Sequence, residues 1–192
     1  LHLCNKNLKN INNIDSDKAR HNLLVDVCMA ANYEAQSLIR DHPQYKLTYD
    51  DSKICTVLAR SFADIGDIIR GKDLYLGNKK KNERETEREK LERYLINIFK
   101  KIHGGLTGGA QNRYQDTKNY YQLREDWWTV NRATVWKAIT CDADGSYFRA
   151  TCGGDNESPS QAHDKCRCPK ISGGKANDQV PTYFDYVPQY LR

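Results

Sequence analysis

Cysteine is the residue type in this chain best placed for covalent chemistry. The seven cysteines occupy positions 4, 28, 55, 141, 152, 166 and 168 of a chain of 192 residues. This usage indicates a disulfide framework formed in an oxidising, exported setting. The odd count leaves at least one thiol without a partner within the chain. The residues predicted to form disulfides are Cys28, Cys55, Cys141, Cys152, Cys166 and Cys168.

The alternative chemistry for the later cysteines is zinc binding. The ligand types for such a site are present at Cys141, Cys152, His163, Cys166 and Cys168. Structural zinc sites usually begin with two cysteines separated by about two to four residues. Here the gaps between successive cysteines are ten, thirteen and one. We therefore predict no metal ion, and free cytosolic thiols are less favoured still.

Positive charge is concentrated in one stretch of the chain. Residues 79–103 carry nine Lys or Arg and five Glu, which gives +4 of the net charge of +5. A basic segment of this kind can bind polyanions such as sulfated glycans, nucleic acid or acidic membranes. The alternative is a solvated helix whose charges cancel in pairs, such as Glu85–Arg88, Glu87–Lys90 and Glu89–Arg93. Charge counting by itself favours the solvated helix.

No pattern in the sequence indicates an enzyme. The five histidines form no His-Glu-x-x-His arrangement, and no nucleophile elbow, phosphate loop or dinucleotide fingerprint is present. The glycines of residues 104–109 follow a predicted helix and lack the Lys-Ser/Thr ending of a phosphate loop, so they indicate a flexible linker. No nucleic-acid-binding signature occurs, and no apolar run approaches the ~20 residues of a membrane span. We predict no catalysis, no cofactor, no nucleic-acid partner and no membrane insertion.

The hydrophobic pattern predicts an all-α fold, a bundle of about four helices with a disulfide-stabilised irregular segment. The predicted helices cover residues 17–40, 50–70, 83–103 and 116–140, and a cysteine-rich irregular segment covers 141–180. Residues 1–180 are predicted to form one helical subdomain. Residues 181–192 are predicted to begin the next one, with Pro181 as the first residue of a new helix.

The sequence predicts how three tryptophans and two cysteines pack. Trp128 and Trp136 share the apolar face of their helix and are predicted core residues, whereas Trp127 points elsewhere and is predicted to pack on a neighbouring subdomain. Cys28 and Cys55 each lie on or beside the apolar stripe of a helix. A bridge between these two cysteines would join two antiparallel helices.

Several long motifs occur in a fixed order along the chain. They span residues 59–71 (ARSFADIGDIIRG), 124–141, 147–152, 165–168 and 185–192 (DYVPQYLR). With these motifs the chain resembles, over its whole length, the alpha-class Duffy-binding-like adhesion domains of the Plasmodium falciparum erythrocyte membrane protein 1 family. A full domain of that family is longer, so the chain resembles its central subdomain. This comparison makes Cys4 the candidate for the unpaired thiol.

The resemblance implies a host-cell adhesion module of a parasite variant surface antigen, displayed on the extracellular face of the infected erythrocyte membrane. Its partners would be host surface receptors or sulfated glycans, in cytoadherence or rosetting, together with neighbouring subdomains. If the domain binds a glycan, the predicted binding residues are Lys79, Lys80, Lys81, Arg84, Arg88, Lys100 and Lys101. One alternative is a structural spacer, with the receptor site elsewhere in the parent protein. A weaker one is an immune-facing surface whose sequence drifts freely.

Overall fold

The structure is a computed structural model of the chain. It describes residues 18–41, 53–74, 85–143, 145, 150–153, 159–162, 165–169 and 179–192. Cys4, His163, Lys79, Lys80, Lys81 and Arg84 lie outside the described residues, as do parts of the irregular segment. The predictions made for these six residues therefore stay predictions.

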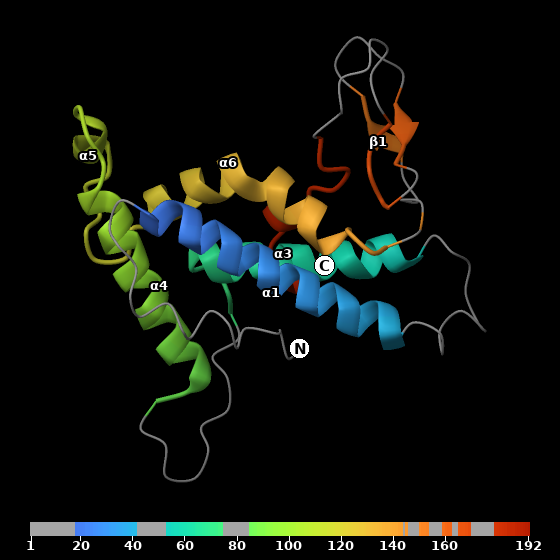
Figure 1. The fold of residues 1–192 in the computed structure, drawn as a ribbon, viewed down its shortest axis with the longest axis horizontal. Coiled ribbons are helices and arrows are strands. Elements are labelled where there is room, and N and C mark those ends of the chain that lie inside the picture. The colour runs from blue at the N-terminus through green and yellow to red at the C-terminus, as the bar shows by residue number, and fades with distance from the viewer. Residues whose placement is uncertain are drawn as a thin grey trace.

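Helices dominate the described structure, which confirms the predicted all-α class. The long helices are α1 (Ala19–Asp41), α3 (Lys53–Arg70), α4 (Glu87–Gly104) and α6 (Tyr121–Ile139). Shorter elements are α5 (Ala110–Arg113), the strands β1 (Ala150–Cys152) and β2 (Ser160–Gln161), and the 3-10 turns η3 (Phe184–Tyr186) and η4 (Gln189–Leu191). Figure 1 shows α1, α3 and α6 side by side, with α4 at one end and the antiparallel β1–β2 pair at the other.

Local hydrogen bonding explains why two helices begin later than predicted. At α4, Thr86 forms a capping box: its hydroxyl accepts from the backbone N–H of Glu89 at 3.1 Å, and the Glu89 carboxylate accepts from the backbone N–H of Thr86 at 2.6 Å. Before α6, the Asp116 carboxylate accepts from three backbone N–H groups, which holds residues 116–120 in a turn. The same bonds lower the pKa of Asp116.

Two of the three tryptophan predictions are confirmed and one is wrong. Trp128 and Trp136 are almost fully buried, as predicted, and both pack on Phe62. The prediction for Trp127 is wrong, because its side chain is buried within the chain and meets Phe99 of α4 edge to face, with ring centroids 6.2 Å apart. Two helices on different sides, α3 and α4, contact α6. Neighbouring positions on α6 can therefore both be buried.

The α3–α6 contact depends on one glycine. A Cβ at Gly66 would lie 2.8 Å from Cζ2 of Trp128. We expect Gly66→Ala to destabilise the chain by about 1–3 kcal/mol in urea unfolding, because a buried indole must shift. Gly104→Ala is the matched control, since a Cβ there meets nothing within 4 Å. Equal stabilities of the two variants would contradict this close packing.

The disulfides correct the predicted cross-links. The bridges are Cys55–Cys166 and Cys152–Cys168, so Cys28–Cys55 is wrong, and Cys28 and Cys141 are free thiols rather than disulfide partners. Cys55 lies fully buried in the first turns of α3, whereas Cys28 is only partly buried on α1. The irregular segment is thereby tied to α3. Three of the candidate zinc ligands, Cys152, Cys166 and Cys168, are occupied in these bridges.

Candidate functional site

A buried cluster of charged side chains joins the first and the last of the sequence motifs, residues 59–71 and 185–192. Asp185, whose side chain is fully buried, accepts from Nε1 of Trp128 at 2.9 Å. The guanidinium of Arg132 donates to both oxygens of the same carboxylate, at 2.8 and 2.9 Å, and to the carbonyl of Thr182 at 2.9 Å. A carboxylate that accepts a bidentate guanidinium is strongly held in place. Residues 182–185 are thus fixed on α6.

Arginines of the last motif and of α3 complete this cluster. Arg192 forms ion pairs with Asp67 and, at 3.5 Å, with Asp64. Arg70 donates to the backbone carbonyl of Asp185 and pairs with Asp67 at 3.0 Å. Burial raises the pKa of Asp67, and the positive charge of Arg192 opposes that rise. Residues 59–71 and 185–192, far apart in sequence, therefore form one contact, which we call the ionic frame.

A second buried arginine extends the ionic frame to α4. Arg124 has no exposed side-chain surface and donates to the carbonyls of Ile68 and Ile69 at 3.0 and 2.6 Å. It also pairs with Glu92 of α4 at 2.6 and 2.9 Å. These bonds satisfy carbonyls at the end of α3 that have no partner within the helix. Arg124 thereby joins α4 to the end of α3.

The predicted basic residues on α4 are partly neutralised. Arg88 pairs with Asp73 at 2.8 Å, and Lys90 pairs with Glu87 at 3.0 Å as predicted. Arg93 pairs with Glu85 at 2.9 Å, rather than with the predicted Glu89, because Glu89 caps the helix. The predicted Glu85–Arg88 pair is likewise replaced by Asp73–Arg88. These pairs support the solvated-helix alternative for the first half of α4.

Lys100 and Lys101 lie near the other end of α4, away from Arg88. Lys100 is exposed and Lys101 is half-buried. The helix has 18 residues at a rise of about 1.5 Å each, so Arg88 and Lys100 are separated by about 18 Å along its axis. The described structure therefore does not gather the predicted cations on α4 into one site.

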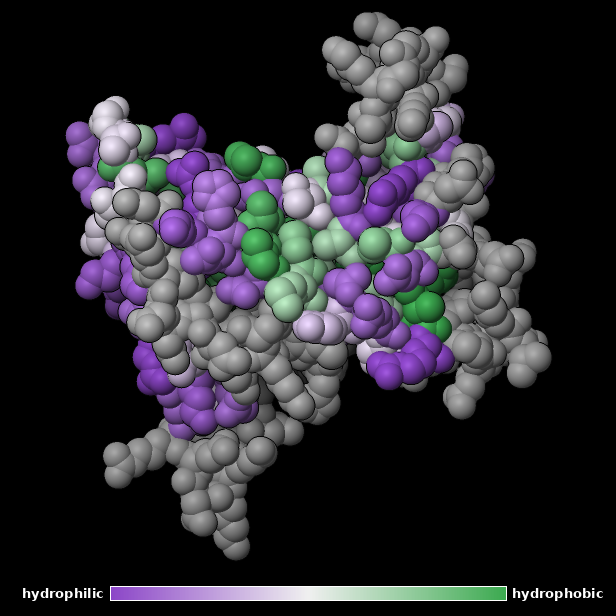
Figure 2. Space-filling model, in the orientation of Figure 1, coloured by the Kyte–Doolittle hydropathy of each residue, from purple (hydrophilic) through white to green (hydrophobic). Residues whose placement is uncertain are grey.

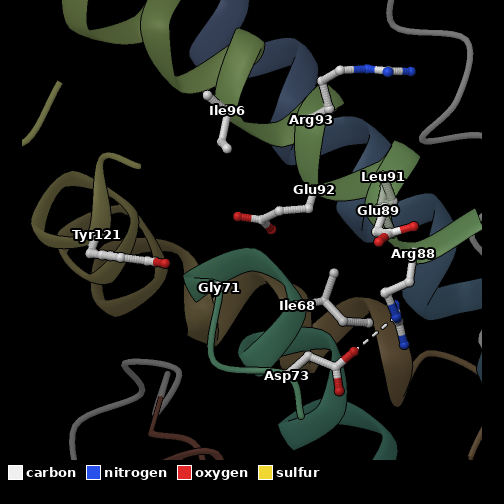
Figure 3. A pocket seen from close by; sticks show the side chains of 10 residues that line it. All are labelled: Ile68, Gly71, Asp73, Arg88, Glu89, Leu91, Glu92, Arg93, Ile96 and Tyr121. Atoms are coloured by element: carbon white, nitrogen blue, oxygen red, sulfur yellow. Dashed lines mark ion pairs between the residues drawn. The ribbon is translucent and has the colours of Figure 1, made fainter. Parts of the chain in front are cut away.

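A hollow of about 380 Å³ lies beside Arg88, between α3, α4 and α6. Figure 3 shows Arg88 directed at Asp73, with Tyr121 on the far side of the hollow. Much of the wall is apolar, from Ile68, Leu91 and Ile96. Both guanidiniums that line the hollow form ion pairs, Arg88 with Asp73 and Arg93 with Glu85, although Nη1 of Arg88 has no hydrogen-bond partner in the described structure.

The described helices, the two disulfides and the ionic frame define a helical, disulfide-bonded domain. The Duffy binding domain model matches residues 1–192, so the chain belongs to the Duffy binding domain family. Comparison with curated proteins returns no match at a significant level. The family is one of adhesion domains and is not a known enzyme family.

The chain is similar to solved domains of PfEMP1 from Plasmodium falciparum. The NTS-DBL1-alpha and CIDR-gamma double domain of the varO strain is 40% identical, with a TM-score of 0.76, over 99% of this chain and 25% of that one. The NTS-DBL1(alpha-1) domain of the same strain is 40% identical, with a TM-score of 0.74, over 99% of this chain and 40% of that one. The chain thus spans 40% or less of these relatives.

Beta-class relatives are less similar in sequence. A PfEMP1 DBLβ domain bound to human ICAM-1 is 34% identical, with a TM-score of 0.62, over 85% of this chain and 35% of that one. The alpha-class resemblance agrees with the higher identity to the DBL1-alpha domains. DBL domains of PfEMP1 are extracellular parts of a parasite surface protein. Within the described residues, no helix is long and apolar enough to cross a membrane.

Proposed function

We propose that the chain is part of an adhesion module that binds host-surface receptors from the extracellular face of the infected erythrocyte membrane. Two PfEMP1 relatives are solved in complex with ICAM-1, which supports a host receptor as the class of partner. The ionic frame supports a scaffold role for the described helices, because its charged groups are turned inward and bound to one another. The contact surface would then lie on the segments that this scaffold carries.

The charge distribution carries the finer proposal, that a sulfated glycan binds where residues 79–84 lead into α4. Residues 79–84 hold four Lys or Arg and one Glu, a net of +3, whereas residues 85–103 hold five and four, a net of +1. The carboxylates of Glu85, just before α4, and of Glu87 and Glu92 on α4 are engaged by cations. The basic character therefore centres on Lys79, Lys80, Lys81 and Arg84, with Arg88, Lys100 and Lys101 as the weaker part of the proposal.

Heparin retention tests the glycan proposal. We expect the chain to bind a heparin column and to elute earlier as salt rises, because exposed charge pairs are screened. Charge reversal at Lys79, Lys80 and Lys81 is expected to weaken binding by at least about tenfold.

The matched control reverses three exposed cations elsewhere, Arg40, Arg60 and Lys118, which gives the same change in net charge. This control is expected to retain most of the binding. Retention that does not depend on salt, or equal losses in the two triple variants, would contradict a glycan site at residues 79–84.

The spacer alternative loses one of its supports. It predicted that another domain buries Trp127, but Trp127 already packs on Phe99 within the chain. A spacer must therefore pack on its neighbours through some other surface.

A further inference from the structure

A second hollow, of about 460 Å³, lies at the corner where the start of α1 meets the loop between α4 and α5. Figure 1 shows the first turn of α1 beside the last turns of α4, and these two helices are in contact. The volume is within the range of roughly 300–1,000 Å³ that is typical of small-molecule sites. The lining includes Arg20 and His21 of α1, together with Ile102, Gly105, Leu106 and Thr107. We call this site the corner hollow.

The apolar part of the lining is held in place by backbone hydrogen bonds. Ile102 is 4% exposed and belongs to the core, and Leu106 packs against that core. The N–H of Gly105 donates to the carbonyls of Lys101 and Ile102 at 3.1 and 3.2 Å, and the N–H of Leu106 donates to the carbonyl of His103 at 3.1 Å. These bonds satisfy carbonyls at the end of α4 and fix the turn that follows. The apolar wall of the hollow is therefore preformed.

Two basic side chains of α1 line the same hollow. Arg20 and His21 are exposed, and no ion pair or hydrogen bond engages their side chains within the described part of the chain. The carboxylate of Asp126 is already engaged, by Arg113 at 3.3 Å and by the hydroxyl of Tyr114, which donates to it at 2.9 Å. Burial and the bond to Asp126 raise the pKa of Tyr114, and the nearby positive charges of Arg113 and Arg20 oppose that rise. Arg20 thus lies near a carboxylate that other donors occupy.

The charge around the corner hollow is positive. Residues 18–21 and 100–118 hold six Lys or Arg and one Asp, a net of +5. The carboxylate of that residue, Asp116, accepts from three backbone N–H groups. Figure 2 shows mainly hydrophilic side chains over α4 and around α5. A surface of this charge attracts anions toward the hollow.

The chemistry of the lining favours an organic carboxylate among the anions. The guanidinium of Arg20 presents parallel N–H groups that match the two oxygens of a carboxylate. A phosphate or sulfate group has a third oxygen that needs donors, but the N–H groups of Gly105 and Leu106 are used within the turn. The apolar wall of Ile102 and Leu106 suits a carbon skeleton, which an inorganic anion lacks.

We propose that the corner hollow binds a small organic carboxylate that has an apolar face. Arg20 holds the carboxylate, His21 donates a further hydrogen bond, and the carbon skeleton lies on Ile102 and Leu106. The hollow is at the end of α4, whereas residues 79–84 precede its start in the sequence. This binding is therefore independent of the glycan proposal.

Cyclohexanecarboxylate is the probe for this site, because it joins one carboxylate to an apolar ring. In amide NMR spectra of the 192-residue chain, it is expected to shift the signals of Gly105, Leu106 and Thr107 in a saturable way. Cyclohexanol lacks the charge and acetate lacks the ring, so each is expected to bind at least about tenfold more weakly. Inorganic sulfate at the same ionic strength is expected to give no saturable shift of these three signals.

Arg20→Gln is expected to weaken the binding of cyclohexanecarboxylate by at least about tenfold, since it removes the charged donor. Arg40→Gln is the matched control, because it removes the same charge from an exposed position at the other end of α1. The control is expected to change the dissociation constant by less than about twofold.

Three results would overturn the proposal: no saturable shift, equal losses in the two variants, or acetate that binds as tightly as cyclohexanecarboxylate. Loss of binding on charge reversal at Lys79, Lys80 and Lys81 would overturn it as well, because the carboxylate would then bind at the segment of the glycan proposal.

Discussion

Replacing Cys55 and Cys166 together with alanine is expected to lower the free energy of unfolding by about 4–5 kcal/mol. The bridge links residues 111 positions apart and so restricts most of the unfolded chain. Both cysteines are fully buried, so alanine also leaves space in the core. Urea unfolding monitored by tryptophan fluorescence measures the change, because Nε1 of Trp136 donates to the carbonyl of Cys166 at 3.1 Å.

Two further variants test whether Cys55 is bridged to Cys166, as in the structure, or to Cys28, as the sequence suggested. The Cys152–Cys168 bridge closes a loop of only 16 residues, so its removal is expected to cost about 3 kcal/mol. Cys28→Ala is expected to cost no more than about 1 kcal/mol, since the thiol is free and partly buried. If Cys28→Ala cost as much as Cys55→Ala, the two residues would be partners and the pairing described here would be wrong.

The cysteine pairing shows what helical periodicity can and cannot determine. Periodicity predicted correctly that Cys28 and Cys55 lie on helices whose apolar faces meet. Periodicity gave no information on which helix the irregular segment 141–180 contacts. Cys166 reaches α3 through a turn in which Lys165 and Cys166 both have positive φ. A turn of that kind carries no helical or strand pattern. The choice between Cys28 and Cys166 as the partner of Cys55 therefore depends on tertiary structure.

The ionic frame was missed for a similar reason. Arg70, Arg124 and Asp185 are charged, and charged side chains are mostly exposed, so sequence reasoning placed none of them in the core. A signal was present, because Asp67 and Arg70 lie next to the buried Ile68 and Ile69 on a helix that is otherwise largely apolar. Motifs 59–71 and 185–192 marked the family in the sequence analysis. In the structure they are the two halves of one contact.

The functional site is predicted less completely than the fold. Net charge identifies a basic stretch at residues 79–103, but it could not show that Arg88 is held by Asp73 or that Arg93 is held by Glu85. The Arg88–Asp73 pair depends on the position of α4 relative to the end of α3, and the Arg93–Glu85 pair depends on where α4 begins. Only four basic residues, at 79–84, remain as the centre of the glycan proposal.

Asp185→Ala is expected to lower the free energy of unfolding by about 3–5 kcal/mol. The substitution removes the acceptor of two Arg132 bonds and of the Trp128 indole N–H, and so leaves a nearly buried guanidinium and a buried N–H unpaired. Unpaired buried groups of this kind retain their full desolvation cost. Asp142→Ala is the control, because Asp142 is exposed near the end of α6; it is expected to change stability by no more than about 0.5 kcal/mol.

A double-mutant cycle shows whether Asp185 acts through Arg132. The two side chains are in direct contact, so Arg132→Met combined with Asp185→Ala is expected to cost less than the sum of the single changes by about 1–3 kcal/mol. Hydrogen exchange supplies an independent readout: in Asp185→Ala, residues 182–192 and the last turn of α3 are expected to lose protection before α4 does. Additive costs, or uniform loss of protection across the molecule, would mean that Asp185 does not hold the two motifs together. A coupled cost with local loss of protection would identify the ionic frame as the unit that fixes the end of α3 and holds residues 182–192 against it.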